Sequence, residues 1–205
     1  MTCLSLYRDI GKKIIDPTGK AIESIAQRKI KMNKPVVEVL KDNPLILLDA
    51  IYYATRFDFD LDDDIKSSAE KFANPLLEST NPGRVNSALM QLFSRPNASK
   101  NFALLFQLNI FQQIFPMLVN AYDDILKYMQ TVEDSIEIPS LDRVYDQFLL
   151  FMKEEDKTKA LAEHPLIKAC FAPKVSQNRY LLHAKNEKPK DLGMPAQAHN
   201  APVNR

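Results

Sequence analysis

Five aspartates lie among the seven residues from 58 to 64, and carboxylates at this density can bind a cation or cap a helix. The spacing begins like a calcium-binding EF-hand loop. That loop needs glycine at its sixth position and glutamate at its twelfth, where this chain has Asp63 and Ala69. The segment also contains the sequence pattern Asp-x-Asp of a metal-binding catalytic pair. These aspartates fall at a corner between two expected helices, however, so the match is one of sequence only. We therefore expect solvated charges and helix capping here, and no metal site.

Two arginines, a histidine and a cysteine are the other residues whose chemistry could serve a site. A guanidinium can recognise phosphate or a base edge, and Arg56 and Arg84 both fall on expected helices. For Arg84 a surface or helix-dipole role is the alternative that we favour. His164 has no acid or nucleophile that would complete a triad, so a cap or surface residue is expected, and Cys170 is expected to pack in the core. Hydrolytic catalysis has no support.

The elements that position these residues follow from the apolar spacing. One helix has a cap at Asp42 or Asn43 and Pro44 at its first helical position, and its apolar residues recur at three- and four-residue steps. We call residues 58–64 the acidic corner. A second helix starts at its end, and the first turn of that helix carries negative charge. Two helices joined by a short acidic corner are therefore predicted.

The same patterns predict a mainly α-helical fold with a small β element near the N-terminus. Gly11 lies between two short extended runs, 3–7 and 13–16, which predict a hairpin, and 29–32 could add a strand to its sheet. Apolar residues between 111 and 128 form a stripe that is typical of a core rather than of a base-stacking surface. Further helices are predicted over residues 21–28, 36–41, 81–93, 98–108 and 140–152, and a last apolar segment spans 166–171.

Charge is unevenly distributed along the 205 residues, which are 45% hydrophobic and 26% charged. The formal net charge of +1 comprises +5 over residues 1–41 and +4 over 174–205, which leaves −8 for 42–173. Because phosphate binding depends on lysine and arginine, contact with RNA is expected at the ends rather than along the acidic body. The tail beyond Pro173 is polar and basic, which predicts disorder.

No apolar run is long enough to predict a secretory leader or a membrane span. The two cysteines, Cys3 and Cys170, lack the spacing of a metal site or a disulfide framework, which is compatible with a reducing compartment. The expected location is cytoplasmic, and export by a non-Sec route stays open.

Several motifs occur in an order that one enzyme family shares. They are Asp16-Pro17-Thr18-Gly19, the run DNPLILLDAIYYA from residue 42, the run RFDFDLD from residue 56, Arg84 with Val85 and Leu89, and Ile114-Phe115-Pro116. This order resembles the class II poly(A) polymerases and tRNA CCA-adding nucleotidyltransferases, from the end of their catalytic head through the neck and body. The positions that the resemblance implies for nucleotide or RNA binding are Asp42, Asn43, Arg56 and Arg84.

The catalytic motifs of that family are not matched. Its head carries a Gly-Ser loop and paired carboxylates that hold two metal ions at the phosphates, and the match begins after that point in a chain with 4 glycines. The family's nucleotide-selecting Glu-Asp-x-x-Arg appears as Asp42, Asn43 and Ile46, so the guanidinium that would pair with a base edge is lost. Two further basic positions are Asp49 and Tyr52. The resemblance with these departures predicts a pseudoenzyme without catalytic residues, metal or cofactor.

The predicted organisation has three parts. A head remnant with a β-hairpin and a short helix spans 1–41, a helical poly(A) polymerase-like body spans 42–173, and a basic disordered tail spans 174–205. The resemblance implies noncatalytic RNA binding, at the 3′ end of a tRNA or mRNA. One alternative is a protein-interaction module, adaptor or effector, whose hairpin edge pairs with another chain or with a second copy in a homodimer. The other is the body half of a split nucleotidyltransferase.

Overall fold

The computed structural model describes residues 1, 7–8, 14–78, 80–94 and 96–171. All the described elements belong to the unit Met1–Phe171. The predicted disordered tail over 174–205 lies outside the described residues, as does the predicted hairpin turn at Gly11.

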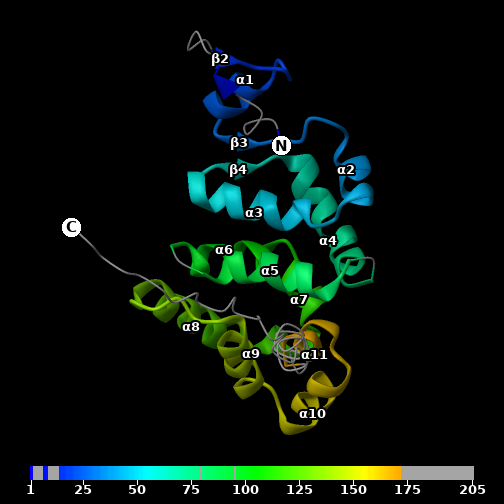
Figure 1. Ribbon diagram of the computed structural model, residues 1–205, viewed down its shortest axis with the longest axis vertical. Coiled ribbons are helices and arrows are strands. Elements are labelled where there is room, and N and C mark those ends of the chain that lie inside the picture. Colours follow the sequence, from blue (N-terminus) through cyan, green and yellow to red (C-terminus); the bar gives the residue numbers. More distant parts are fainter. Residues whose placement is uncertain (2–6, 9–13, 79, 95, 172–205) are drawn as a thin grey trace, which may run out of the picture. The chain divides into compact units, whose positions relative to one another are not determined.

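Helices make up most of the described residues, which confirms the mainly α-helical fold class (Figure 1). None of these helices combines the length and apolar character that crossing a bilayer requires. Their bounds are α1 Ala21–Ala26, α2 Val36–Asp42, α3 Ile46–Phe57, α4 Asp63–Glu78, α5 Pro82–Phe93, α6 Ala98–Gln107, α7 Ile110–Ile114, the 3₁₀ helix η2 Pro116–Ala121, α8 Tyr122–Asp134, α9 Leu141–Leu150, α10 Glu154–Glu163 and α11 Pro165–Phe171.

Four short strands form two separate pairs among the described residues. β1 (Tyr7–Arg8) pairs antiparallel with β2 (Ile14–Ile15), which confirms the predicted hairpin. β3 (Lys29–Ile30) pairs parallel with β4 (Asp60–Leu61), so the suggestion that 29–32 joins the hairpin sheet is wrong. We call this second pair the β3–β4 clasp. It ties the segment before α2 to the corner between α3 and α4, a contact that no local pattern predicts.

The connection from α2 to α3 differs from the predicted helix start. Asp42 is the last residue of α2 rather than a cap of α3. Asn43 is extended, its Oδ1 accepts a bond from the Leu45 N–H at 3.2 Å, and Pro44 lies in a tight turn, so that α3 begins two residues later, at Ile46. The predicted cap at Asp42 or Asn43 and the predicted proline at the first helical position are thus both wrong for α3. Its N-cap is Leu45, without a side-chain cap bond, because the chain must first end α2 and reverse.

The core is built on the apolar faces that the sequence periodicity predicts. One face of α3 is buried, and this helix packs against α5 and α6. The predicted stripe is largely core as well, and its first residue, Phe111, is buried. This ring meets Phe102 edge to face at a centroid distance of 5.0 Å and Phe148 at 5.8 Å, the arrangement that aromatic quadrupoles favour. Cys170 is half-buried and packs against this core.

A buried asparagine joins three helices that are distant in the sequence. Asn86 of α5 accepts a hydrogen bond from the Tyr145 hydroxyl of α9 at 2.7 Å and donates to the Leu166 carbonyl of α11 at 2.9 Å. Buried polar groups are tolerated when they are satisfied in this way. The network therefore fixes the position of α9 and α11 on α5.

His164 is buried, with 8% of its surface exposed, so the expectation of a surface histidine is wrong. Its Nε2 lies 2.7 Å from the Ile114 carbonyl oxygen, which can only accept, and its ring stacks on Phe115 at 5.0 Å. Nδ1 faces the Ile167 N–H at 3.5 Å, at the start of α11, which agrees with the expected cap. The burial depends on contact with Ile114, 50 residues earlier in the chain, so the residues next to His164 in the sequence do not indicate it.

We expect the stabilising effect of His164 to depend on pH. Burial lowers the pKa of its imidazole from the usual 6.5, and the bond to the Ile114 carbonyl offsets part of that shift. Below 6.5 the unfolded chain takes up a proton that the folded chain resists, so stability falls as pH falls. The advantage of wild type over His164→Gln in urea unfolding should therefore shrink between about pH 7.5 and about pH 5.5.

A neutral core substitution, Met152→Leu, serves as the control, and its difference from wild type should be the same at both pH values. A His164→Gln difference that is equally constant would show that the imidazole titrates alike in the folded and unfolded chain, and would contradict the expectation.

Candidate nucleic-acid interface

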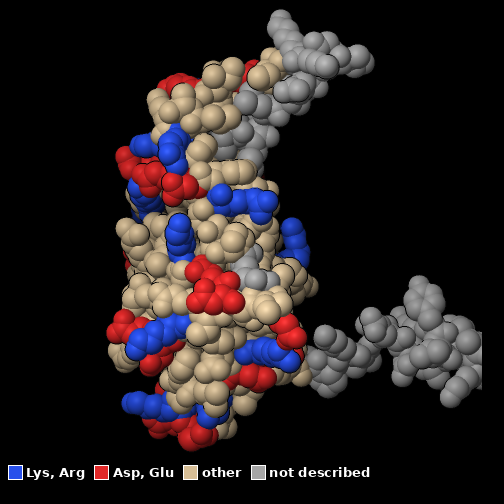
Figure 2. Space-filling view, turned by 90° about the vertical axis from the view of Figure 1, so that its left-hand side faces the viewer, with Lys and Arg blue, Asp and Glu red and all other residues tan. Residues whose placement is uncertain are grey.

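Charged side chains on the face drawn in Figure 2 are mixed in sign, and no continuous basic track crosses it. Sequence-independent binding along a phosphate backbone depends on such a track. Any contact with RNA on this face must therefore be local.

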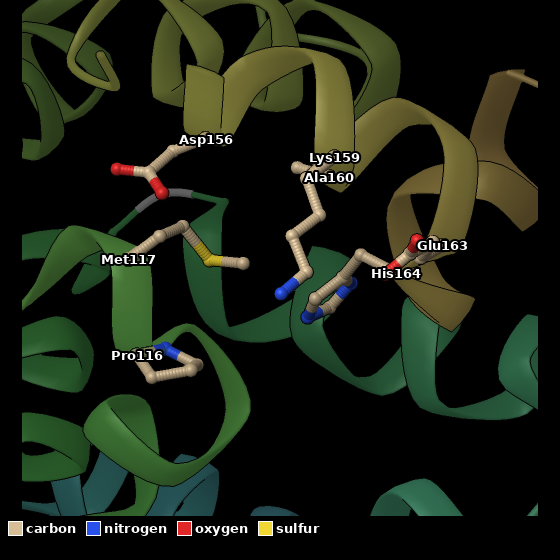
Figure 3. A pocket seen from close by; sticks show the side chains of 7 residues that line it. All are labelled: Pro116, Met117, Asp156, Lys159, Ala160, Glu163 and His164. Carbon is tan, nitrogen blue, oxygen red and sulfur yellow. The ribbon is translucent and has the colours of Figure 1, made fainter.

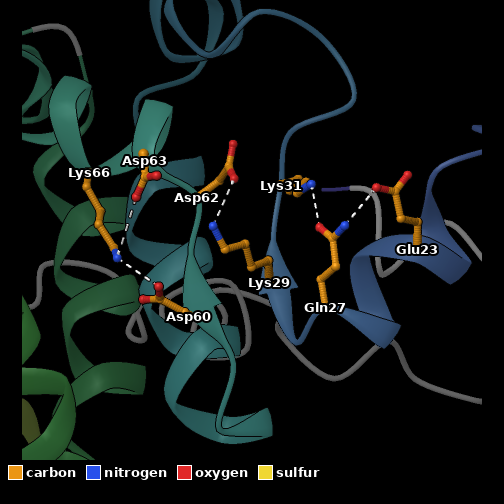
Figure 4. A network of polar contacts seen from close by, with 8 residues as sticks. All are labelled: Glu23, Gln27, Lys29, Lys31, Asp60, Asp62, Asp63 and Lys66. Carbon is orange, nitrogen blue, oxygen red and sulfur yellow. Dashed lines mark hydrogen bonds and ion pairs between the residues drawn. The ribbon is translucent and has the colours of Figure 1, made fainter.

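The aspartates of the acidic corner hold side chains and a helix end in place (Figure 4). α3 ends at Asp58, whose φ of 54° is left-handed, and α4 starts after Asp62, whose carbonyl accepts from the Ile65 N–H at 3.0 Å. The ion pairs are Arg28–Asp58 at 2.6 Å, Lys66–Asp60 at 2.8 Å and Lys29–Asp62 at 3.9 Å. These carboxylates are solvent-exposed or partly so, as expected, and their partners are lysine and arginine side chains.

A cavity of about 390 Å³ lies between η2 and α10 (Figure 3). Pro116 and Met117 face it from η2, and the Lys159 side chain extends toward the ring of His164. Both ring nitrogens of His164 already face backbone groups, one carbonyl and one N–H. The histidine is therefore occupied in holding the fold together and is unsuited to transferring protons in this cavity.

A second cavity, of about 380 Å³, brings together three of the four residues that the resemblance implies for nucleotide binding. The end of α2, the turn after it and the start of α5 form its walls. It is lined by Lys41, Asp42, Asn43, Pro44, Thr80, Asn81 and Arg84. We call it the Arg84 cavity. No motif in the sequence indicates Lys41, Thr80 or Asn81 as site residues, although each lies within four residues of a position that the resemblance implies.

The start of α5 aims Arg84 at this cavity. Asn81 caps the helix, since its Oδ1 accepts from the Gly83 N–H at 2.8 Å and its carbonyl accepts from the Arg84 N–H at 2.9 Å. A Cβ at Gly83 would lie 3.1 Å from that Oδ1, so glycine suits the close cap. The first N–H groups of α5 are thus satisfied internally, and the guanidinium of Arg84 is the donor that remains for a ligand.

The charges around the Arg84 cavity favour a polar ligand with an anionic group. Arg84 is exposed and, within the described part of the chain, has no ion-pair partner, and the same holds for Lys41. Asp42 adds one carboxylate to these two cations, so the cavity offers donors for phosphate and an acceptor for an amine or hydroxyl.

Arg56 does not line this cavity. It lies in the last turn of α3, where its Nη1 donates to the Tyr52 hydroxyl at 2.7 Å. Ile46, which stands where the resemblance expects an arginine, packs against the core. Burial raises the pKa of the Asp49 carboxyl, at another position where a basic residue is expected. All three positions of α3 at which the resemblance expects a basic residue, 46, 49 and 52, thus carry another type, and Arg56 is the basic residue of this helix.

Comparison with known proteins finds a protein family whose model matches part of the chain. Residues 58–122 match the family model described as "Probable RNA and SrmB- binding site of polymerase A". The matched segment includes Arg84 and begins after Asp42, Asn43 and Arg56. A search of curated proteins finds no match.

A solved structure titled "The complex structure of CCA-adding enzyme with ATP" is similar with a TM-score of 0.57 and 19% sequence identity. The alignment covers 75% of this chain and 38% of that chain, and at this identity it establishes a shared fold. The polymerase A match over residues 58–122 and the fold shared with a CCA-adding enzyme together confirm the predicted resemblance to the poly(A) polymerase and CCA-adding enzyme family.

Proposed function

We propose that this chain is a noncatalytic RNA-binding module that holds the 3′ end of a tRNA or mRNA. The observation that carries the proposal is the match of residues 58–122 to the model of a probable RNA and SrmB- binding site, because this segment supplies Arg84 and one wall of the Arg84 cavity. In this proposal residues 1–41 are a head remnant, 42–173 the RNA-holding body and 174–205 a basic tail.

The Arg84 cavity has the size and donors that one nucleotide requires. Ligand sites commonly enclose about 300–1,000 Å³ and place a few polar groups on otherwise simple walls. Arg84 and Lys41 would contact phosphate, while Asp42 and Asn43 would face the sugar or base edge. Nucleotide selection would be weak, since Ile46 offers no hydrogen bond to a base edge.

Arg84→Ala should weaken binding of a fluorescently labelled tRNA or oligo(A) by about 1–3 kcal/mol, or roughly 5- to 150-fold, because a charge-assisted phosphate contact is lost. Arg84→Lys should retain part of the affinity, since it keeps the charge but not the planar fork. Fluorescence anisotropy at two salt concentrations measures both variants on the full chain.

Lys168→Ala is the matched control, since Lys168 is exposed on α11 outside the matched segment and its loss changes the net charge equally. Equal losses for the two alanine variants would mean that RNA senses only total charge, and would refute a site at Arg84.

The purified chain should not add nucleotides to RNA. With Mg²⁺ or Mn²⁺, tRNA and labelled ATP or CTP, we expect no incorporation above a reaction without protein, because the sequence shows no paired carboxylates in the setting that metal-assisted nucleotidyl transfer needs. A CCA-adding enzyme in parallel reactions verifies the assay. Incorporation that rises with the amount of the chain would show that it is an enzyme.

A protein-interaction module is a second candidate, favoured by apolar side chains near the hairpin. Ile14 of β2 is 57% exposed, and Ile22 and Ile25 of α1 are 59% and 39% exposed. Ile22 and Ile25 are three residues apart and so share one face of α1, and a contiguous exposed apolar patch is typical of a surface that another chain covers. The covering chain would be a partner protein, a second copy, or the separate catalytic head of a split nucleotidyltransferase.

Sedimentation velocity tests the homodimer form of this candidate. We expect wild type to self-associate and the double variant Ile22→Lys with Ile25→Lys to remain monomeric, since two buried charges would oppose the interface. Ile138→Lys, at a residue that is 60% exposed in the α8–α9 connection, is the control. A wild type that is monomeric at all concentrations would exclude the homodimer.

A further inference from the structure

Four aromatic side chains gather at the end of α3 and on the residues that follow it. Tyr52 and Tyr53 meet edge to face at a centroid distance of 5.2 Å, Tyr53 and Phe57 lie 5.8 Å apart with planes only 12° from parallel, and Phe57 and Phe59 lie 6.0 Å apart. We call these four residues the aromatic platform.

The platform is not part of the buried face of α3. That face consists of Leu47, Leu48, Ala50, Ile51 and Ala54. Phe57 is 42% exposed, and Tyr52, Tyr53 and Phe59 are each partly exposed. A single exposed aromatic residue is ordinary on a protein surface, whereas a continuous series of ring contacts at the surface offers several π-faces together.

Arg56 supplies the platform with a positive charge. Its guanidinium carbon lies 5.7 Å from the centre of the Tyr52 ring, and its Nη1 donates to the Tyr52 hydroxyl. In the described part of the chain no carboxylate pairs with Arg56, whereas the neighbouring Arg28 and Lys66 are paired with Asp58 and Asp60. Among these three cations, Arg56 is therefore the one that no carboxylate neutralises.

Stacked rings with an unpaired guanidinium match the chemistry of single-stranded nucleic acid. Bases stack on aromatic faces regardless of their sequence, and arginine contacts both phosphate and π-systems.

We propose that Tyr53, Phe57 and Arg56 form a stacking site for unpaired bases of single-stranded RNA, separate from the Arg84 cavity. The site rests on the proposed RNA-binding function and adds a substrate class to it: an unpaired strand, bound without base preference. Bases would stack on the exposed faces of Phe57 and Tyr53, and Arg56 would contact the adjacent phosphate.

The absence of tryptophan from the sequence allows a direct test. In the full-length Phe57→Trp variant the introduced indole is the one tryptophan of the chain, and stacking on a base quenches its emission. The probe is an oligo(A) of about 12 nucleotides, within the site sizes of single-strand binders. We expect saturable quenching by oligo(A), and none by duplex RNA or by inorganic polyphosphate, which has no bases.

Phe171→Trp is the matched reporter, since Phe171 is 37% exposed and lies outside the platform, and its emission should not change with oligo(A). Affinity provides an independent measure. Phe57→Leu and Tyr53→Leu should each weaken oligo(A) binding about fivefold or more, while Phe171→Leu should not, with circular dichroism verifying that the helices are retained.

The outcomes separate the platform from the proposed function. RNA that binds by anisotropy without quenching the Phe57→Trp emission would overturn the platform and leave the proposed function standing. The absence of any RNA binding would overturn both. Quenching by polyphosphate equal to that by oligo(A) would overturn the platform in favour of an indirect effect. Emission that changes with protein concentration in the absence of RNA would overturn it in favour of a protein interface.

Discussion

Burial of one face of α3 is the constraint on which the rest of the described structure depends. α3 contacts α2, α5, α6 and both strands of the β3–β4 clasp, and burial of its Leu47, Leu48 and Ile51 side chains contributes about 1.5–3 kcal/mol each. The Arg84 cavity begins at the turn before this helix, and the aromatic platform lies at its end. Both candidate sites are therefore held by the same packed face, and loss of that packing would disturb both.

The sequence predicts the parts of this fold that depend on local interactions. Asn81 followed by proline and glycine predicts the start of α5, and the spacing of Val85, Leu89 and Leu92 predicts its buried face, because a cap and a helical period act within a few residues. The hairpin and the apolar stripe that begins at Phe111 follow for the same reason.

The remaining features depend on partners that are distant in the chain. The pairing of β3 with β4 and the burial of His164 against Ile114 cannot be read from neighbouring residues. The candidate sites likewise combine residues that the sequence indicates with contacts that only the fold creates. The resemblance implies Asp42, Asn43 and Arg84, but these residues come together only because the end of α2 lies near the start of α5. The aromatic residues of the platform cannot be told from core residues by sequence alone, and their exposure is seen only in the structure.

The β3–β4 clasp bears on how this protein could be shortened. Ile30 and Leu61 are almost completely buried, and the N–H groups of Asp60 and Asp62 donate to the carbonyls of Arg28 and Ile30 at 2.8 and 3.0 Å. A fragment starting at residue 42 would remove both acceptors and leave Leu61 uncovered. The segment that precedes α2 thus completes the helical body, and a fragment that keeps this pairing has to begin upstream of Arg28.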